Sequence, residues 1–147
     1  MNQITINEYL SLYLDKEYKQ ITNLANFVAI IKEMIENLNW VGIYLYDGKE
    51  LYLGPFQGKA AVQTIPMGEG VCGTAAKTKE MIVVDDVHAY EGHIACDDAS
   101  NAEIVIPILV NGTLLGVLDI DSPVHHRFGQ ETINTIQKAV DFLFDFL

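Results

Sequence analysis

This 147-residue sequence contains two cysteines, and the cysteine side chain can take part in several kinds of chemistry. Cys96 lies within the polar stretch 88–103, directly before Asp97 and Asp98, and Cys72 lies in a glycine-rich stretch. A cysteine can be a nucleophile, a redox partner, a metal ligand or an inert small apolar residue, and the residues alone leave these alternatives open. The two aspartates oppose formation of a thiolate at Cys96, so charge does not activate it.

Three carboxylates are placed where they can form an acidic site. Asp119 and Asp121 are two residues apart on an expected strand, so their side chains point to the same face, and Glu103 lies at the entry to the partner strand. Converging acids can bind an ammonium group, and an acid whose pKa is raised by burial can donate a proton. The alternative is that these acids lie at a solvent-exposed strand end. For Asp121, this alternative and a role in a site are equally compatible with the sequence. An exposed strand end is a poorer explanation for Asp119, because Asp119 stands between the apolar residues Leu118 and Ile120.

Trp40 and Tyr44 share one face of another expected strand, because their spacing is even. Core packing is the ordinary role of such a pair, and the apolar wall of a pocket is the alternative. The histidines offer a different chemistry, because His88 and His93 with Cys96 could suggest a metal. Their spacing is not a recognised zinc pattern, so we expect no metal and assign the histidines to hydrogen bonds that shape the loop.

Apolar stripes with helical spacing predict three helices, over residues 5–18, 22–37 and 130–146. Thr5 or Asn7 can cap the first helix and Thr22 the second. Runs rich in β-branched and aromatic residues predict strands over residues 40–46, 50–53, 60–65, 81–84, 104–110 and 113–120. Asp47-Gly48 and Asn111-Gly112 are turn signals that predict two hairpins.

These elements predict an α+β fold with a central antiparallel sheet of about six strands. The N- and C-terminal helices would cover one face, and the loops over residues 57–103 would cover the other. The sheet and site loops would span residues 40–121. The stretch 88–103 is expected to be an ordered, site-bearing loop, with a ligand pocket between the loops and the sheet. No internal repeat or linker is visible, so we expect residues 1–147 to form a single domain.

Charge and hydropathy argue against several classes of partner. The net charge is −11, from 20 acidic and 9 basic residues, which disfavours nucleic acid and anionic membranes. No apolar run approaches the ~18 residues of a membrane span, and no secretory signal is visible at the N-terminus. We therefore expect a cytoplasmic protein, in which the two cysteines do not form a permanent structural disulfide.

Several phrases of the sequence resemble a known family. The glycine-rich stretch 65–76, the hairpin ending in Gly116-Val-Leu-Asp-Ile-Asp121 and the closing helix resemble a GAF domain, a small-molecule sensing module that is occasionally an enzyme. The phrases over residues 54–59, 70–75, 86–88, 92–97, 99–103 and 116–121 narrow the resemblance to the free methionine-(R)-sulfoxide reductases. The match runs from residue 40 to residue 128, and Gly92-His-Ile-Ala-Cys-Asp97 is a highly specific phrase.

By this resemblance, Cys96 is the catalytic nucleophile. Its sulfur attacks the sulfoxide sulfur, methionine leaves, and a sulfenic acid remains on Cys96. A second thiol then forms a disulfide with it, which thioredoxin reopens. Members of the family usually have a third cysteine, at the position that Val62 occupies here. We therefore expect Cys72 to resolve Cys96 directly.

The resemblance also implies a set of substrate-binding residues. Glu103, Asp119 and Asp121 belong to the site, and Trp40 and Tyr44 line the pocket, with Trp40 against the substrate methyl group. No organic cofactor is expected. The alternatives to an enzyme are a non-catalytic GAF sensor of a small molecule and a dimerisation module. GAF domains commonly pair, so a homodimer is also open.

Overall fold

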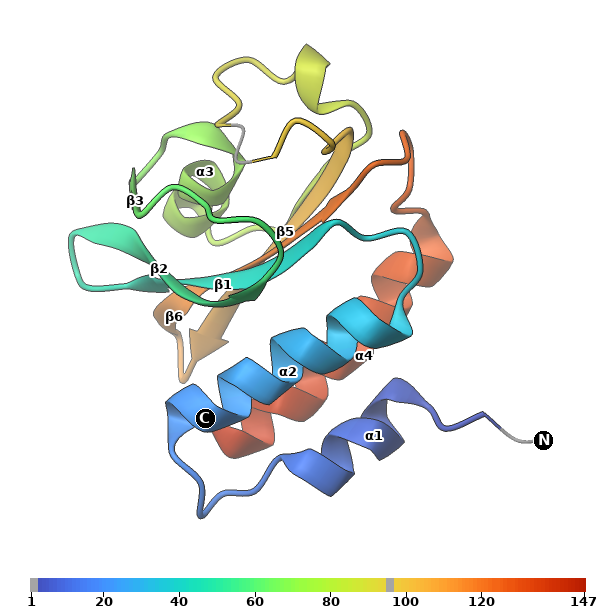
Figure 1. Cartoon of the computed structure of the whole chain (residues 1–147). Helices are drawn as coiled ribbons and strands as arrows, with labels where there is room; N and C mark the ends of the chain where they lie inside the picture. Colours follow the sequence, from blue (N-terminus) through green and yellow to red (C-terminus); the bar gives the residue numbers. More distant parts are fainter. Residues whose placement is uncertain (1–2, 95–96) are drawn as a thin grey trace.

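The computed structural model describes residues 3–94 and 97–147 (Figure 1). The helices are α1 (Ile6–Tyr13), α2 (Gln20–Met34), α3 (Gly70–Thr78) and α4 (Gln130–Leu143), with short 3-10 turns η1 (Val87–Ala89) and η2 (Phe144–Phe146). The strands are β1 (Trp40–Tyr46), β2 (Glu50–Gln57), β3 (Thr64–Pro66), β4 (Ile82–Val84), β5 (Ala102–Val110) and β6 (Thr113–Ser122). The predicted α+β fold is confirmed.

The described strands form a six-stranded antiparallel sheet in the order β3-β2-β1-β6-β5-β4. Both predicted hairpins are present. Asn111 and Gly112 have φ angles of 52° and 80°, and two successive positive φ angles are what a tight type I′ hairpin turn requires. Strand β1 of the first hairpin pairs with β6 of the second. The two hairpins therefore meet at the centre of the sheet.

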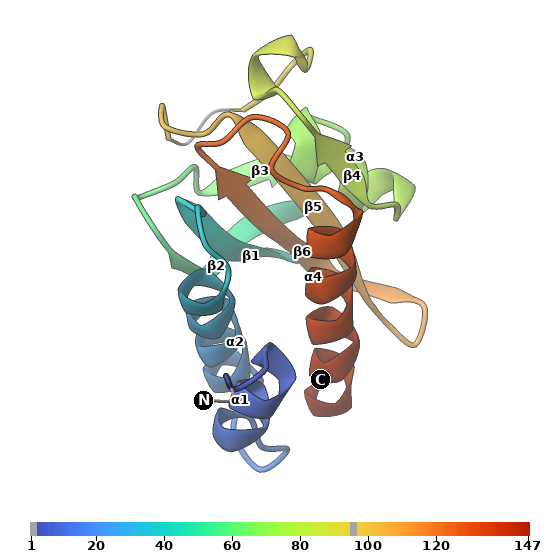
Figure 2. The same cartoon turned by 90° about the vertical axis from the view of Figure 1, so that its right-hand side faces the viewer.

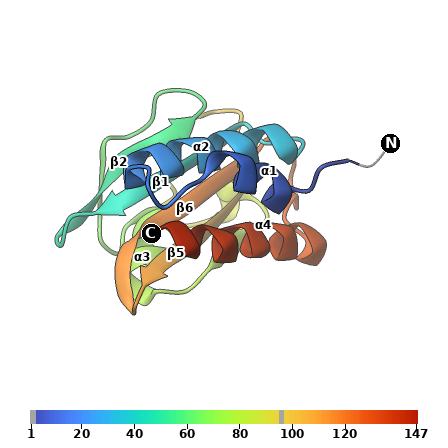
Figure 3. The same ribbon diagram turned by 90° about the horizontal axis from the view of Figure 1, so that it is seen from below.

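Helices α1, α2 and α4 cover one face of the sheet, and α3 with the loops lies on the other (Figures 2 and 3). Alternation along β1 divides its side chains between the two faces. Val41 and Ile43 pack with the three helices, whereas Trp40 and Tyr44 pack in a second apolar cluster with Cys72 of α3. The face that carries Trp40 and Tyr44 is thus the face covered by loops, as predicted.

Several predicted helix boundaries are wrong. Helix α2 ends at Met34 rather than at residue 37, and α4 ends at Leu143, with the 3-10 turn η2 taking its place to Phe146. Helix α1 begins as expected, with the Thr5 hydroxyl accepting from the Glu8 amide, but it ends at Tyr13. The chain turns there because the Asn23 side chain accepts from the Asp15 amide and donates to the Asp15 carbonyl. Helix α2 begins at Gln20 rather than Thr22, since backbone bonds to Lys19 already start it. No helix in the described chain is long and apolar enough to cross a membrane.

Strand boundaries differ in the segment after the first hairpin. Residues 54–57, which lie beyond the strand predicted over residues 50–53, belong to β2, where a register shift between Gly42 and Tyr44 of β1 accommodates Pro55. The third strand is restricted to Thr64–Pro66. Just before it, the Val62 carbonyl accepts a hydrogen bond from the Tyr44 hydroxyl at 2.8 Å.

Candidate active site

Three carboxyl groups meet on the loop-covered face of the sheet. In the strand register, Glu103 of β5 lies opposite Asp121 of β6, and Asp121 lies opposite Trp40 of β1. Asp119 is two residues from Asp121 on the same strand and lies opposite Gly42, where the Trp40 ring occupies the place of a side chain. Glu103, Asp119 and Asp121 are only 4%, 6% and 7% exposed, so the alternative of a solvated strand end is wrong.

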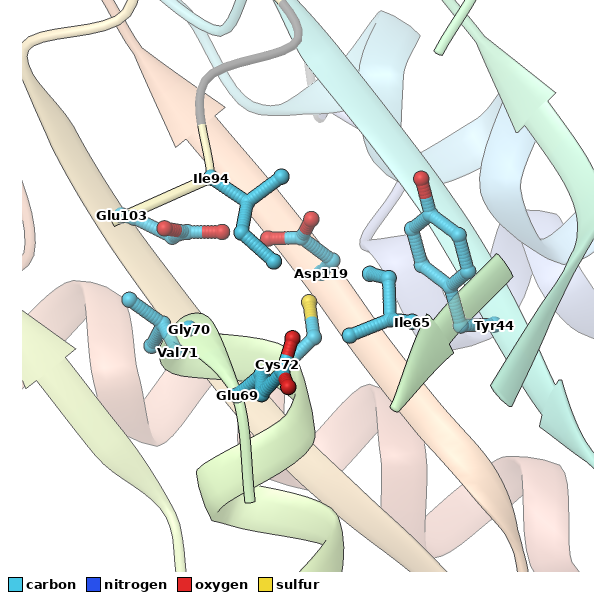
Figure 4. Close-up of a pocket in the computed structure, with 9 residues that line it drawn as sticks. All are labelled: Tyr44, Ile65, Glu69, Gly70, Val71, Cys72, Ile94, Glu103 and Asp119. Atoms are coloured by element: carbon cyan, nitrogen blue, oxygen red, sulfur yellow. The ribbon is translucent and has the colours of Figure 1, made fainter. Parts of the chain in front are cut away.

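Helix α3 places a thiol against these acids. The helix begins at Gly70, whose φ of +65° a residue with a side chain would rarely adopt, and its first turn presents Cys72 to the sheet. Ligating atoms of Cys72, Glu103 and Asp119 all lie within 4.8 Å of one another. Figure 4 shows the Cys72 sulfur directed toward the two carboxyl groups. The Cys72 thiol hydrogen-bonds to Asp119, and Asp119 hydrogen-bonds to Glu103.

Burial keeps protons on this cluster. Burial raises the pKa of Glu103 well above its usual value, with repulsion from Asp121 adding to the effect. Burial likewise raises the pKa of Asp119, with Glu103 adding to it. The pKa of Cys72 is also raised, first by burial and then by the charges of Asp119 and Glu103. The site therefore combines buried acids that retain protons with a protonated thiol.

The same three groups are close enough together to share one metal ion. A metal would require their deprotonated forms, whereas the burial described above favours the protonated ones. The hydrogen bonds among the three groups already satisfy their polar atoms in part. The donor set thus fits a proton-holding cluster better than a metal site, and the absence of a metal stays a prediction.

The cavity at this site is small. It is lined by Tyr44, Ile65, Glu69, Gly70, Val71, Cys72, Ile94, Glu103 and Asp119 (Figure 4). Its volume is about 10 Å³, which is room for about one water molecule. Ile94 forms one side of this cavity and packs closely on Gly70. A methyl group built onto Gly70 would lie only 3.0 Å from the Ile94 side chain. A cavity of this volume has no room for an amino acid.

The aromatic pair is placed as the register predicted. Trp40 and Tyr44 stack with ring centres 6.0 Å apart, and Phe56 also stacks with Trp40, at 5.4 Å. Tyr44 lines the cavity, whereas Trp40 and Asp121 adjoin it without forming its wall. The indole of Trp40 donates to the Lys59 carbonyl at 3.0 Å. This bond ties the segment after β2 over the aromatic pair.

Sequence reasoning did not identify Glu69 or Ile94 as wall residues. Glu69 stands inside the glycine-rich phrase and Ile94 inside the histidine phrase, but residue type alone does not show that the two segments meet. Cys96 lies outside the described residues, so its pairing with Cys72 stays a prediction. Of the described residues around it, Ile94 lines the cavity, and Asp97 accepts hydrogen bonds from the Asn39 side chain and the Ala99 amide.

Known proteins share both the sequence and the fold of this chain. Residues 22–143 match the GAF domain family. The chain is 44% identical to the free methionine-R-sulfoxide reductase of Escherichia coli over 135 residues, which cover 92% of this chain and 82% of the relative. It is 49% identical to the free methionine-R-sulfoxide reductase of Saccharomyces cerevisiae over 137 residues, 88% of this chain and 76% of the relative.

A solved structure supports the same grouping. The fRMsr of Staphylococcus aureus in complex with substrate has a TM-score of 0.90 to this chain at 40% identity. The match covers 97% of this chain and 93% of that one. The chain therefore belongs to the GAF domain family and, within it, to the free methionine-R-sulfoxide reductases.

Proposed function

We propose that this protein reduces free methionine-(R)-sulfoxide to methionine, with Cys96 as the nucleophile and Cys72 as the resolving thiol. The observation that carries the proposal is the buried cluster in which Cys72, Glu103 and Asp119 lie within 4.8 Å of one another. Sulfoxide reduction by thiols needs these two kinds of group, a thiol that is oxidised and an acid that protonates oxygen. The relatives named above have this activity in their names.

In the first step, the Cys96 sulfur attacks the sulfoxide sulfur. Two electrons pass from the thiol to the sulfoxide, the S–O bond breaks, and the oxygen remains on Cys96 as a sulfenic acid while methionine leaves. A buried acid accelerates this step by donating a proton to the sulfoxide oxygen, which makes the sulfur more electrophilic. Ile94 lies two residues before Cys96 and lines the cavity. Two residues span at most about 7 Å, so this distance supports access of Cys96 to the acids.

In the second step, the Cys72 sulfur attacks the sulfenic sulfur of Cys96. A disulfide forms, and the hydroxyl group leaves as water after taking the proton that the Cys72 thiol gives up. Asp119 is the group that relays this proton, because its carboxyl hydrogen-bonds to the Cys72 thiol. A dithiol such as thioredoxin then opens the disulfide and returns both cysteines to thiols. This route needs no cysteine at Val62.

The acids also explain the choice of a free amino acid. One oxygen of Asp119, Oδ1, is buried without a hydrogen-bond partner among the described residues, and such an atom favours a ligand that can donate to it. The ammonium group of a free amino acid is such a donor. Tyr44 and Trp40 provide the apolar side that suits the thioether-like chain. A sulfoxide inside a polypeptide has no ammonium group and is expected to be a poor substrate.

Chromatographic assay of methionine from each epimer of free methionine sulfoxide, with a dithiol as reductant, tests this function. We expect methionine from the R epimer only, and none from Cys96→Ser. Cys72→Ser, which keeps Cys96, should release methionine in the first turnover and then slow. A non-catalytic sensor would bind the sulfoxide without forming methionine, so absence of methionine from both epimers would contradict the proposal.

A further inference from the structure

Among the described residues, His93 contacts the acid cluster formed by Glu103, Asp119 and Asp121 through Glu103. Its Nε2 atom lies 3.1 Å from Oε1 of Glu103, on strand β5. The two side chains are 12% and 6% exposed, so the contact is largely shielded from water. The His93 amide donates to the Tyr90 carbonyl at 3.3 Å, which helps to hold the loop in place. This contact joins the site loop to the floor of the cavity.

Glu103 is the central member of the acid cluster. It hydrogen-bonds to both Asp119 and Asp121, the two acids on β6. Burial lowers the pKa of His93, so its imidazole is neutral near pH 7 and does not act as a counter-ion for the carboxyl group. A neutral imidazole can donate one N–H bond while Glu103 keeps its acid proton for the neighbouring acids or for a substrate oxygen.

We propose that His93 is a positioning residue that donates its Nε2–H to Oε1 of Glu103 and so holds the Glu103 carboxyl group directed toward Asp119 and the cavity. This role rests on the proposed sulfoxide reduction. An acid that must protonate the sulfoxide oxygen works only at hydrogen-bonding distance and in the right orientation. A carboxyl group that is hydrogen-bonded through only one oxygen can rotate about the bond that joins it to the side chain. The hydrogen bond from His93 restricts this rotation of the Glu103 carboxyl group.

Three variants test the role. His93→Phe keeps a ring of similar size and removes the donor, and should lower kcat for the R epimer by about 10- to 100-fold with KM changed less than about threefold. His93→Gln places an amide N–H near the position of Nε2 and should recover kcat to within about threefold of the wild type. His88→Phe is the matched control, because His88 lies in the same loop and contacts Asn101 at 3.0 Å, away from the acids. It should leave kcat within about twofold.

Either of two kinetic results overturns the role. One is a kcat of His93→Phe no lower than that of His88→Phe. The other is a kcat of His93→Gln as low as that of His93→Phe, because a positioning bond must be restored by another donor. The comparison is made at several pH values, since a non-titrating Gln that recovers kcat across the range separates positioning from proton transfer by imidazole.

An NMR measurement decides the contact independently of activity. Long-range ¹H–¹⁵N correlation of the histidine rings should show the proton of His93 on Nε2, and Glu103→Ala should shift the His93 signals but not those of His88. A proton on Nδ1, or signals unchanged in Glu103→Ala, would overturn the inference. If the wild type makes no methionine while the NMR result holds, the proposed function fails and the His93 contact stands.

Discussion

Asp119 connects the two chemical steps at the scale of single residues. It touches the thiol of Cys72 on one side and Glu103 on the other, and both contacts lie below the protein surface. Water would screen the repulsion between acids, but burial removes this screening and raises the pKa of both carboxyl groups. The chain of contacts from Cys72 through Asp119 to Glu103 is suited to proton transfer. Ionisation of these buried acids lowers the stability of the folded protein.

The stability of the protein should therefore fall as the pH rises above the ordinary range of a carboxyl group. Asp119 and Glu103 have pKa values raised in the folded state, so the folded protein binds more protons than the unfolded chain. Its stability is complete below the unfolded pKa values and declines as pH rises through the folded ones. We expect Asp119→Asn to have a Tm above the wild type at pH 8 and close to it at pH 4.

Thermal unfolding followed by circular dichroism at both pH values measures this difference. Asp47→Asn is the control, because hydrogen bonds from the Glu50 and Lys49 amides lower the pKa of Asp47. Asp47 therefore favours folding once it is ionised, and its replacement should not raise the Tm at pH 8. If the Tm of Asp119→Asn changed with pH as much as the Tm of the wild type, ionisation of Asp119 would not destabilise the folded state, and the prediction would be wrong.

At the scale of elements, the site depends on how closely α3 approaches the sheet. Gly73 follows Cys72, and a methyl group built onto it would lie 2.5 Å from the Pro66 carbonyl of β3. The Gly73 carbonyl also accepts from the Gly68 amide at 2.8 Å. The close approach of α3 to β3 thus sets the position of the Cys72 thiol over the acids.

Gly73→Ala should push α3 away from β3 and lower the free energy of unfolding by about 1–3 kcal/mol. Denaturation in urea measures this loss. The same shift should slow formation of the Cys72–Cys96 disulfide, measured by mass spectrometry after a single turnover. Gly129→Ala is the matched control, because nothing lies within 4 Å of a methyl group there. Similar stability in both variants would mean that α3 can move without cost.

At the scale of the whole molecule, patterns of period and turn chemistry were sufficient to predict the layers. Asn111-Gly112 specified its hairpin because these two residue types readily adopt the two positive φ angles of a tight type I′ turn, which suits twisted strands. The apolar stripe could not show that α1 stops at Tyr13, since the bonds that turn the chain come from Asn23, ten residues later. The extension of β2 through Pro55 depends on its partner strand, which local propensity does not record.

The site was predictable to a similar degree. Even spacing placed Asp119 with Asp121 and Trp40 with Tyr44, because a strand alternates strictly. The contacts of Ile94 with Gly70 and of His93 with Glu103 join distant segments and follow from the fold alone. Direct resolution by Cys72, a cytoplasmic location, the homodimer and thioredoxin as the reductant stay predictions.

A single-turnover measurement tests the central claim most directly. Reduced protein is mixed with free methionine-(R)-sulfoxide in the absence of any reductant, and both methionine and the cysteine state are measured. The account predicts about one methionine per chain and a Cys72–Cys96 disulfide, because two thiols supply the two electrons of one reduction. No methionine, or methionine formed while both cysteines remain thiols, would contradict it.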